Sequence, residues 1–91
     1  MYLTWNEAKR QRNLKKHGLD FADATTVFAG ETFTWEDRRF TYDEQRFISI
    51  GLLGELVVVI AHTEDAETIH LISMRKAEKR EQQLYFAHCG G

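Results

Sequence analysis

The chain has 91 residues, of which 43% are hydrophobic and 29% charged, with a formal net charge of −2, no proline and one cysteine. This is the composition of one globular domain, and it excludes both a disordered segment and a two-domain enzyme with a large cofactor fold. The longest apolar run, Leu56–Ala61, is far shorter than the roughly 20 residues that cross a bilayer.

The first third of the chain predicts two short helices. Thr4–Glu7 matches the capping box, in which a threonine and a glutamate three residues later bond to each other's free backbone amides. We therefore expect a helix over residues 6–16, ended by Gly18 in the left-handed conformation. Asp20 can cap a second helix, whose apolar residues recur at helical spacing until Gly30.

The hydrophobic period then changes to two, which is typical of strands. The expected strands cover residues 32–35, 39–42, 46–51, 56–62 and 68–73. Gly51–Gly54 and Thr63–Ala66 are the expected turns between the last three strands, and such short links favour an antiparallel meander. Leu56–Ile60 lacks polar alternation, so this strand is expected at the centre of the sheet.

A helical period returns from Met74 and predicts a C-terminal helix. The elements together predict an α+β fold: two N-terminal helices, an antiparallel meander of four to five strands, and a C-terminal helix packed on the sheet. We expect one domain over residues 1–88, with residues 89–91 as a flexible tail. The single Cys89 cannot form an intramolecular disulfide and the first residues show no charged leader, so a cytoplasmic location is expected.

Charge is distributed unevenly along the chain. Residues 1–17 carry a net charge of +4 and residues 74–91 carry +2, whereas residues 18–45 carry −5 and residues 46–73 carry −3. Two basic segments on one side of the fold would form a positive groove able to hold phosphates. Charge alone favours the alternative that both segments are ordinary solvated helix faces.

Several short segments, in a particular order, carry a family resemblance. They are Trp5–Lys9 with Asn13, Lys16–Gly18 with Phe21 and Ala24, Val27–Phe28, Asp37–Arg39, Glu44–Arg46, Val57–Thr63, and Ile72–Ala77 leading to Glu81 and Tyr85. In these segments the chain resembles the BrnT family of toxins from bacterial type II toxin–antitoxin operons, which are ribonucleases with a RelE-like fold.

The resemblance implies a metal-independent RNA endonuclease that inhibits translation and growth. It also implies neutralisation by a cognate BrnA-like antitoxin, a small ribbon-helix-helix protein that dimerises, represses the shared operon and forms a complex with two toxin copies. Operator DNA would then be contacted only through the antitoxin. No cofactor and no metal are expected, since the sequence has no CxxC or HExxH spacing and no glycine-rich phosphate loop.

Such cleavage needs a base for the 2′-hydroxyl proton, an acid for the 5′ oxygen and cations for the charged phosphorane. His17 is the first candidate for proton transfer, because imidazole titrates near neutral pH, and its alternative role is to cap a helix C-terminus. Lys16 would bind the phosphate, or is an ordinary solvated lysine. Arg75, expected where the last strand meets the last helix, could make two bonds to a phosphate or pair with Glu78 or Glu81.

The remaining candidates have weaker signals. His62 and Glu64 end the central strand, from which a base could reach the same cleft, although a structural histidine and a plain turn carboxylate are the commoner roles. Tyr85 is expected either in the core or as a phenolic acid. Aromatic residues of the strands could stack on RNA bases, but a core or partner interface is favoured. The residues expected to contact RNA are Lys9, Arg12, Lys76, Lys79 and Arg80.

A second hypothesis is a catalytically silent toxin-like module that only binds the antitoxin and aids repression. Asp65–Ala66 and His70 stand where many relatives carry an Arg-Gly turn and a strand arginine. The net charge of −8 over residues 18–73 would also repel RNA from much of the surface.

Overall fold

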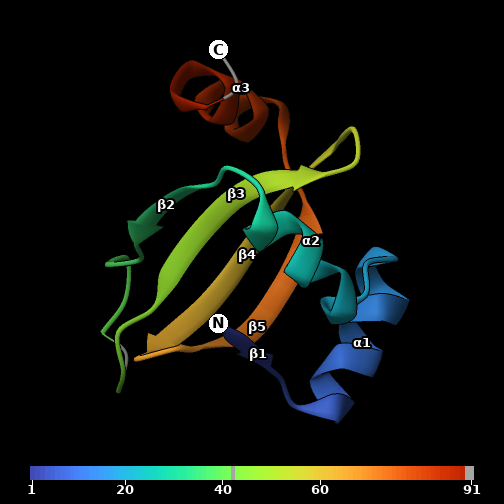
Figure 1. The fold of residues 1–91 in the computed structure, drawn as a ribbon, viewed down its shortest axis with the longest axis vertical. Helices are drawn as coiled ribbons and strands as arrows, with labels where there is room; N and C mark the ends of the chain where they lie inside the picture. The colour runs from blue at the N-terminus through green and yellow to red at the C-terminus, as the bar shows by residue number, and fades with distance from the viewer. Residues whose placement is uncertain (42, 90–91) are drawn as a thin grey trace.

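In the computed structural model, which describes residues 1–41 and 43–89, five strands form one mixed sheet with the order β1-β5-β4-β3-β2 (Figure 1). In chain order the elements are β1 (Tyr2–Thr4), α1 (Glu7–His17), the 3₁₀ helix η1 (Phe21–Asp23), α2 (Ala24–Ala29), β2 (Phe33–Glu36), β3 (Phe47–Leu53), β4 (Leu56–Asp65), β5 (Thr68–Lys76) and α3 (Lys79–His88). The α+β class and the central position of β4 are confirmed.

The expected purely antiparallel meander is wrong at one edge. Strands β2 to β5 do pair antiparallel in sequence order, but β1 pairs with β5 in parallel, with Tyr2 opposite Thr68 and Thr4 opposite His70. Three residues carry too little periodicity to be recognised as a strand, and the partner of β1 lies more than 60 residues away in the sequence. Local pattern therefore could not reveal this pairing.

The N-terminal helix starts one residue later than expected and has a different cap. Asn6, not Thr4, is the N-cap residue, and its side chain accepts a hydrogen bond of 3.0 Å from the Lys9 amide. Thr4 instead lies in β1, where its hydroxyl contacts the ring of His70 at 2.9 Å. At the other end, Gly18 adopts the left-handed conformation with φ of 70°, as predicted.

The other predicted helices and strands are present with one exception, but several begin or end at other residues than expected. Asp20 caps a helix as expected, but this helix begins as η1 and continues as α2. The expected strand over residues 39–42 is wrong for residues 39–41, which form no strand, and residue 42 lies outside the described residues. The Asp37 side chain accepts hydrogen bonds from both the amide and the guanidinium of Arg39, and these bonds turn the chain. Met74 continues β5, so α3 begins only at Lys79.

Each face of the sheet has its own apolar core. In Figure 1, α2 lies in front of the sheet, α1 beside the β5 edge and α3 above its upper end. The core under α2 contains Leu19, Phe21, Ala24, Val27, Val58, Ile60, Ile69, Leu71 and Met74. The core under α3 contains Ile48, Ile50, Val57, Val59, Ala77, Tyr85 and Cys89. Cys89, the first residue of the expected tail, is buried in this core, and residues 90–91 lie outside the described part of the chain.

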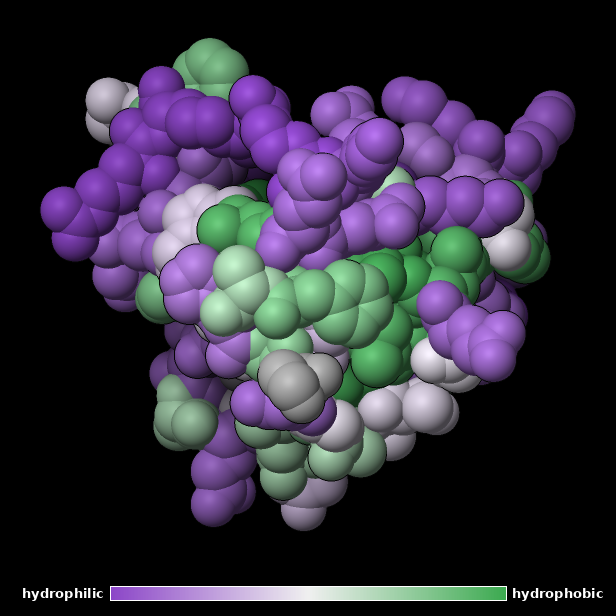
Figure 2. Space-filling view, turned by 90° about the horizontal axis from the view of Figure 1, so that it is seen from above, coloured by the Kyte–Doolittle hydropathy of each residue, from purple (hydrophilic) through white to green (hydrophobic). Residues whose placement is uncertain are grey.

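Helix α3 leaves apolar surface open at its end of the molecule. Figure 2, which looks at this end from above, shows apolar side chains across the middle of the face and hydrophilic ones along one side. Among the residues near α3, Phe86 and Trp35 are exposed, and Trp35 lines a shallow hollow with Leu84 and Arg80.

Candidate phosphate-binding site

Helix α1 lies against the part of β5 that β1 does not cover. β1 pairs only with Thr68–His70, and beyond this point the side chains of α1 and β5 enclose an open hollow of about 400 Å³. Its lining residues are Lys9, Arg12, Asn13, Lys16, His17, Ile72 and Ser73. We call this feature the α1–β5 hollow; it brings four of the predicted site residues together.

The two sides of α1 differ in how their cations are neutralised. Away from the hollow, the Arg10 guanidinium donates to both Asp20 oxygens at 2.8 and 2.9 Å, and these bonds lower the pKa of Asp20 to about 2. In the hollow, Lys9, Arg12 and Lys16 form no ion pair within residues 1–41 and 43–89. No acidic side chain of the described residues lines it. The hollow is therefore suited to an anion.

Arg75 lies on the same sheet face as the hollow's Ser73. Ser73 pairs with Ala61 and Arg75 with Val59, so the two side chains are alternate residues on the α3 side of β5. Arg75 lies one residue before the end of β5, close to the junction with α3 where it was expected, but it belongs to the strand and not to the helix. Its guanidinium donates two bonds of 2.8 Å to the Glu81 carboxylate, which raise the pKa of Arg75, so the ion pair weighed as its alternative role is present.

His62 does not reach this face. Its ring lies under α2, fully buried between Phe28 and Phe47. Its Nε2 is 2.7 Å from the Ser49 hydroxyl, and Nδ1 is 3.6 Å from a Glu64 oxygen. This order of groups is that of a serine–histidine–carboxylate triad, but Ser49 and His62 are both 0% exposed, so no substrate can approach them. Burial lowers the pKa of His62 to about 4, so the ring is neutral at neutral pH.

The other predicted residues also lie outside the hollow. The Tyr85 hydroxyl donates to the Glu31 carbonyl at 3.0 Å, and burial raises the pKa of this phenol, as its core role requires. Lys76 ends β5, while Lys79 and Arg80 begin α3; these three cations are exposed and do not line the hollow.

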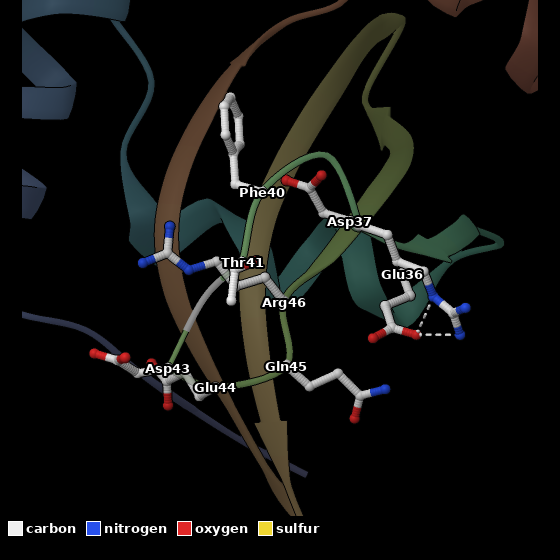
Figure 3. Close-up of a pocket in the computed structure, with 9 residues that line it drawn as sticks. Glu36, Asp37, Phe40, Thr41, Asp43, Glu44, Gln45 and Arg46 are labelled. Carbon is white, nitrogen blue, oxygen red and sulfur yellow. Dashed lines mark hydrogen bonds and ion pairs between the residues drawn. The ribbon is translucent and has the colours of Figure 1, made fainter.

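A charged loop connects β2 and β3, and between residues 37 and 46 it carries three carboxylates and three arginines. Figure 3 shows the residues around a pocket of about 280 Å³ within this loop, where Asp37, Asp43 and Glu44 contribute carboxylates. Asp37 is buried and accepts two bonds from the Arg39 guanidinium.

Sequence reasoning missed the uncharged lining residues of the hollow, of which Asn13 and Ser73 are polar and Ile72 is apolar. Asn13 follows Lys9 by four positions and precedes Lys16 by three, so helical spacing alone could have placed it on the cationic face. Ser73 could not be found in this way, because a β-bulge shifts the register between Ala61 and His62 of β4 and their partners on β5. No local sequence pattern marks this irregularity.

No helix within residues 1–41 and 43–89 is both long and apolar enough to pass through a membrane. No group of three or more histidine, cysteine, aspartate or glutamate side chains in this part of the chain is arranged to hold a metal ion.

The sequence matches the model of a known protein family. Residues 5–81 match the model of a family described as "Ribonuclease toxin, BrnT, of type II toxin-antitoxin system". The matched range contains all of α1 and β5 and ends at Glu81 in the first turn of α3. No curated protein matches the chain.

Proposed function

The chain belongs to the BrnT family of ribonuclease toxins of type II toxin–antitoxin systems, and from this premise we propose that it is an endoribonuclease whose α1–β5 hollow binds the RNA backbone. The observation that carries the proposal is the hollow itself, in which four basic residues of one helix meet a strand hydroxyl without any lining carboxylate. Unneutralised cations in an open hollow are the arrangement that attracts phosphates.

His17 is assigned the proton transfer in this reaction. It is the last residue of α1, followed by the left-handed Gly18, and it lines the hollow. A base takes the 2′-hydroxyl proton as that oxygen attacks phosphorus, and the P–O5′ bond breaks while an acid protonates the leaving oxygen. The products are a 2′,3′-cyclic phosphate and a 5′-hydroxyl, with no net change in protons.

The cations have two roles. Lys16 lies next to His17 in the hollow and would bind the phosphate whose bond breaks, while Arg75 would stabilise the charge of the phosphorane from the neighbouring part of β5. Lys9 and Arg12 would hold the adjacent backbone, and the exposed Lys76, Lys79 and Arg80 would steer RNA toward the site. The proposal gives no step to His62 or Tyr85, which are buried, or to Glu64, whose carboxylate lies 3.6 Å from the buried His62 ring.

The test compares neighbouring positions of α1. Lys16→Ala and His17→Ala are assayed with Lys15→Ala, which removes an exposed lysine of the same helix that does not line the hollow. With single-stranded RNA and EDTA, we expect His17→Ala to lower cleavage by about 10²–10⁴-fold, and Lys15→Ala to leave it nearly unchanged. Undiminished cleavage by folded Lys16→Ala and His17→Ala, or cleavage only with a divalent ion, would overturn the mechanism.

The partner and the cellular effect complete the proposal. As a member of a toxin–antitoxin family the chain has an antitoxin partner, which we take to be a BrnA-like ribbon-helix-helix protein that contacts operator DNA. We also take the fold to be RelE-like and the cytoplasm to be where the chain acts. Induced expression should arrest translation and growth, and co-expression of the small protein encoded next to it should reverse the arrest.

A silent module remains the second candidate, because two observations favour it. Arg75 is already held by Glu81, and His70, which replaces an arginine of many relatives, contacts Thr4 of β1. On this hypothesis the wild-type chain and its His17→Ala variant would both be harmless when expressed, while each would still bind the antitoxin.

A further inference from the structure

Asn13 is the only residue of α1 that is buried in the described structure, and it is polar. Its side chain makes three hydrogen bonds to backbone groups. Nδ2 donates to the Met74 carbonyl at 2.9 Å and to the Leu19 carbonyl at 3.1 Å, and Oδ1 accepts from the Met74 amide at 3.1 Å.

These bonds replace a missing strand. β5 runs from Thr68 to Lys76, but β1 pairs only with its first three residues. At Met74 the outer edge of β5 presents an amide and a carbonyl that a neighbouring strand would ordinarily satisfy. The amide of Asn13 supplies one donor and one acceptor to this edge, as a strand residue would.

Asn13 also sits at the centre of the proposed site. On α1 it is a surface neighbour of Lys9, four positions before it, and of Lys16 and His17, three and four positions after it. On β5 its partner Met74 stands between Ser73 and Arg75. One side chain therefore joins the helix that carries the cations to the strand segment that carries the hydroxyl and the guanidinium.

We propose that Asn13 is a positioning residue, whose amide fixes the distance between the α1 cations and the Ser73–Arg75 segment so that both can contact one RNA backbone. This inference rests on the proposed ribonuclease function. Asn13 itself takes no part in the chemistry. Displacement of a catalytic group by about 1 Å costs on the order of 10²-fold in rate, and the rest of α1 has no buried side chain to hold its position.

Two variants and a matched control test the inference. Asn13→Gln keeps the amide but lengthens the side chain by one methylene, so the hydrogen bonds can form only if α1 moves away from β5. Asn13→Ala removes the bonds altogether. Val27→Ala, which truncates a buried residue of α2 in the same core as Met74, serves as a destabilised control with the cationic helix left intact.

Three measurements are made at a temperature where all variants are folded: single-turnover cleavage of single-stranded RNA, the salt dependence of RNA binding, and hydrogen exchange of the Met74 amide. We expect Asn13→Gln to cleave about 10²-fold more slowly and to show a shallower salt slope, because fewer phosphates are contacted together. Val27→Ala should keep the wild-type slope and cleave at close to the wild-type rate. In Asn13→Ala the Met74 amide should lose its protection.

Wild-type cleavage and salt slope in folded Asn13→Gln and Asn13→Ala would overturn the positioning role. The same loss in Val27→Ala would show that Asn13 acts only through stability, which also overturns it. If Asn13→Ala does not fold, Asn13→Gln, which keeps its donor and acceptor, decides the question. Failure of the wild-type chain to bind or cleave RNA would instead refute the proposed function, and Met74 protection would still report the hydrogen bonds.

Discussion

Arg75 and Glu81 are joined by two parallel hydrogen bonds of 2.8 Å between strand β5 and the first turn of α3. The same Glu81 carboxylate accepts the Glu78 amide at 2.8 Å and so completes the capping box of α3. One carboxylate therefore caps the N-terminus of α3 and also binds the arginine that we propose stabilises the phosphorane. Its pKa is lowered chiefly by Arg75, so Glu81 stays ionised at neutral pH and is a poor general base.

This pair predicts a measurable coupling. Glu81→Gln keeps an acceptor for the Glu78 amide but places an NH₂ group against the guanidinium, and we expect a loss of about 1 kcal/mol in the free energy of unfolding. Arg75→Ala should cost a similar amount, and the double variant little more. Urea denaturation of the four proteins gives the coupling energy, which should shrink in high salt. Glu67→Gln, at an exposed turn, should combine additively with Arg75→Ala; equal coupling there would contradict the prediction.

His62 predicts a pH dependence of stability. Burial lowers its pKa to about 4 from an ordinary value of 6.5, so between these two pH values the unfolded chain binds a proton that the folded chain does not. Stability should therefore be constant with respect to this group above pH 6.5 and fall as the pH drops through the window. From pH 7 to pH 5 we expect a loss of about 2 kcal/mol from His62 alone.

The contribution of His62 is isolated by difference. His62→Asn lacks the titrating ring, so the gap in unfolding free energy between wild type and variant should narrow by about 2 kcal/mol between pH 7 and pH 5. Glu64 and Ser49, the polar groups nearest the ring, are present in both proteins. A gap of the same size at both pH values would show that the folded protein already binds the proton.

The fold was predictable from sequence where the determining signals are local. Gly18 ends α1 because the backbone adopts the left-handed conformation there, which glycine reaches easily. The apolar run of β4 correctly indicated a strand that is covered on both faces. The position of β1 was not predictable, because its hydrogen bonds depend on Thr68–His70 at the other end of the chain. The capping box expected at Thr4 does not form, because Asn6, two residues later, is the N-cap residue of α1.

The site was predictable only in part, for the same reason. Helical spacing brings Lys9, Arg12, Lys16 and His17 to one face, and the hollow contains all four. His62 was expected in the cleft because it ends a central strand, but strand periodicity cannot say which face a helix will cover. The alternation that puts Ile60 into the α2 core puts His62 there too.

Gly51 predicts a packing constraint between α2 and β3. A Cβ at this position would lie 2.7 Å from Cγ1 of Val27 and 3.0 Å from Cγ2 of Thr32. We expect Gly51→Ala to lower the free energy of unfolding by about 2 kcal/mol, because the clash is with Val27, which is fully buried in the core. Gly30→Ala is the matched control, since its Cβ would meet nothing closer than 3.7 Å and should change stability by less than about 0.5 kcal/mol. Equal effects of the two changes in urea denaturation would refute the clash.

Ala66 predicts a stabilising change in the turn between β4 and β5. Its φ of 40° makes it the one non-glycine residue with a positive φ in the described chain. Glycine adopts this conformation without the contact between Cβ and the carbonyl oxygen, so Ala66→Gly should raise the free energy of unfolding by about 0.5–1 kcal/mol. Ala87→Gly, in the exposed part of α3, should lower it by about 1 kcal/mol. Thermal unfolding compares the two, and a lower midpoint for Ala66→Gly would show that this turn does not strain alanine.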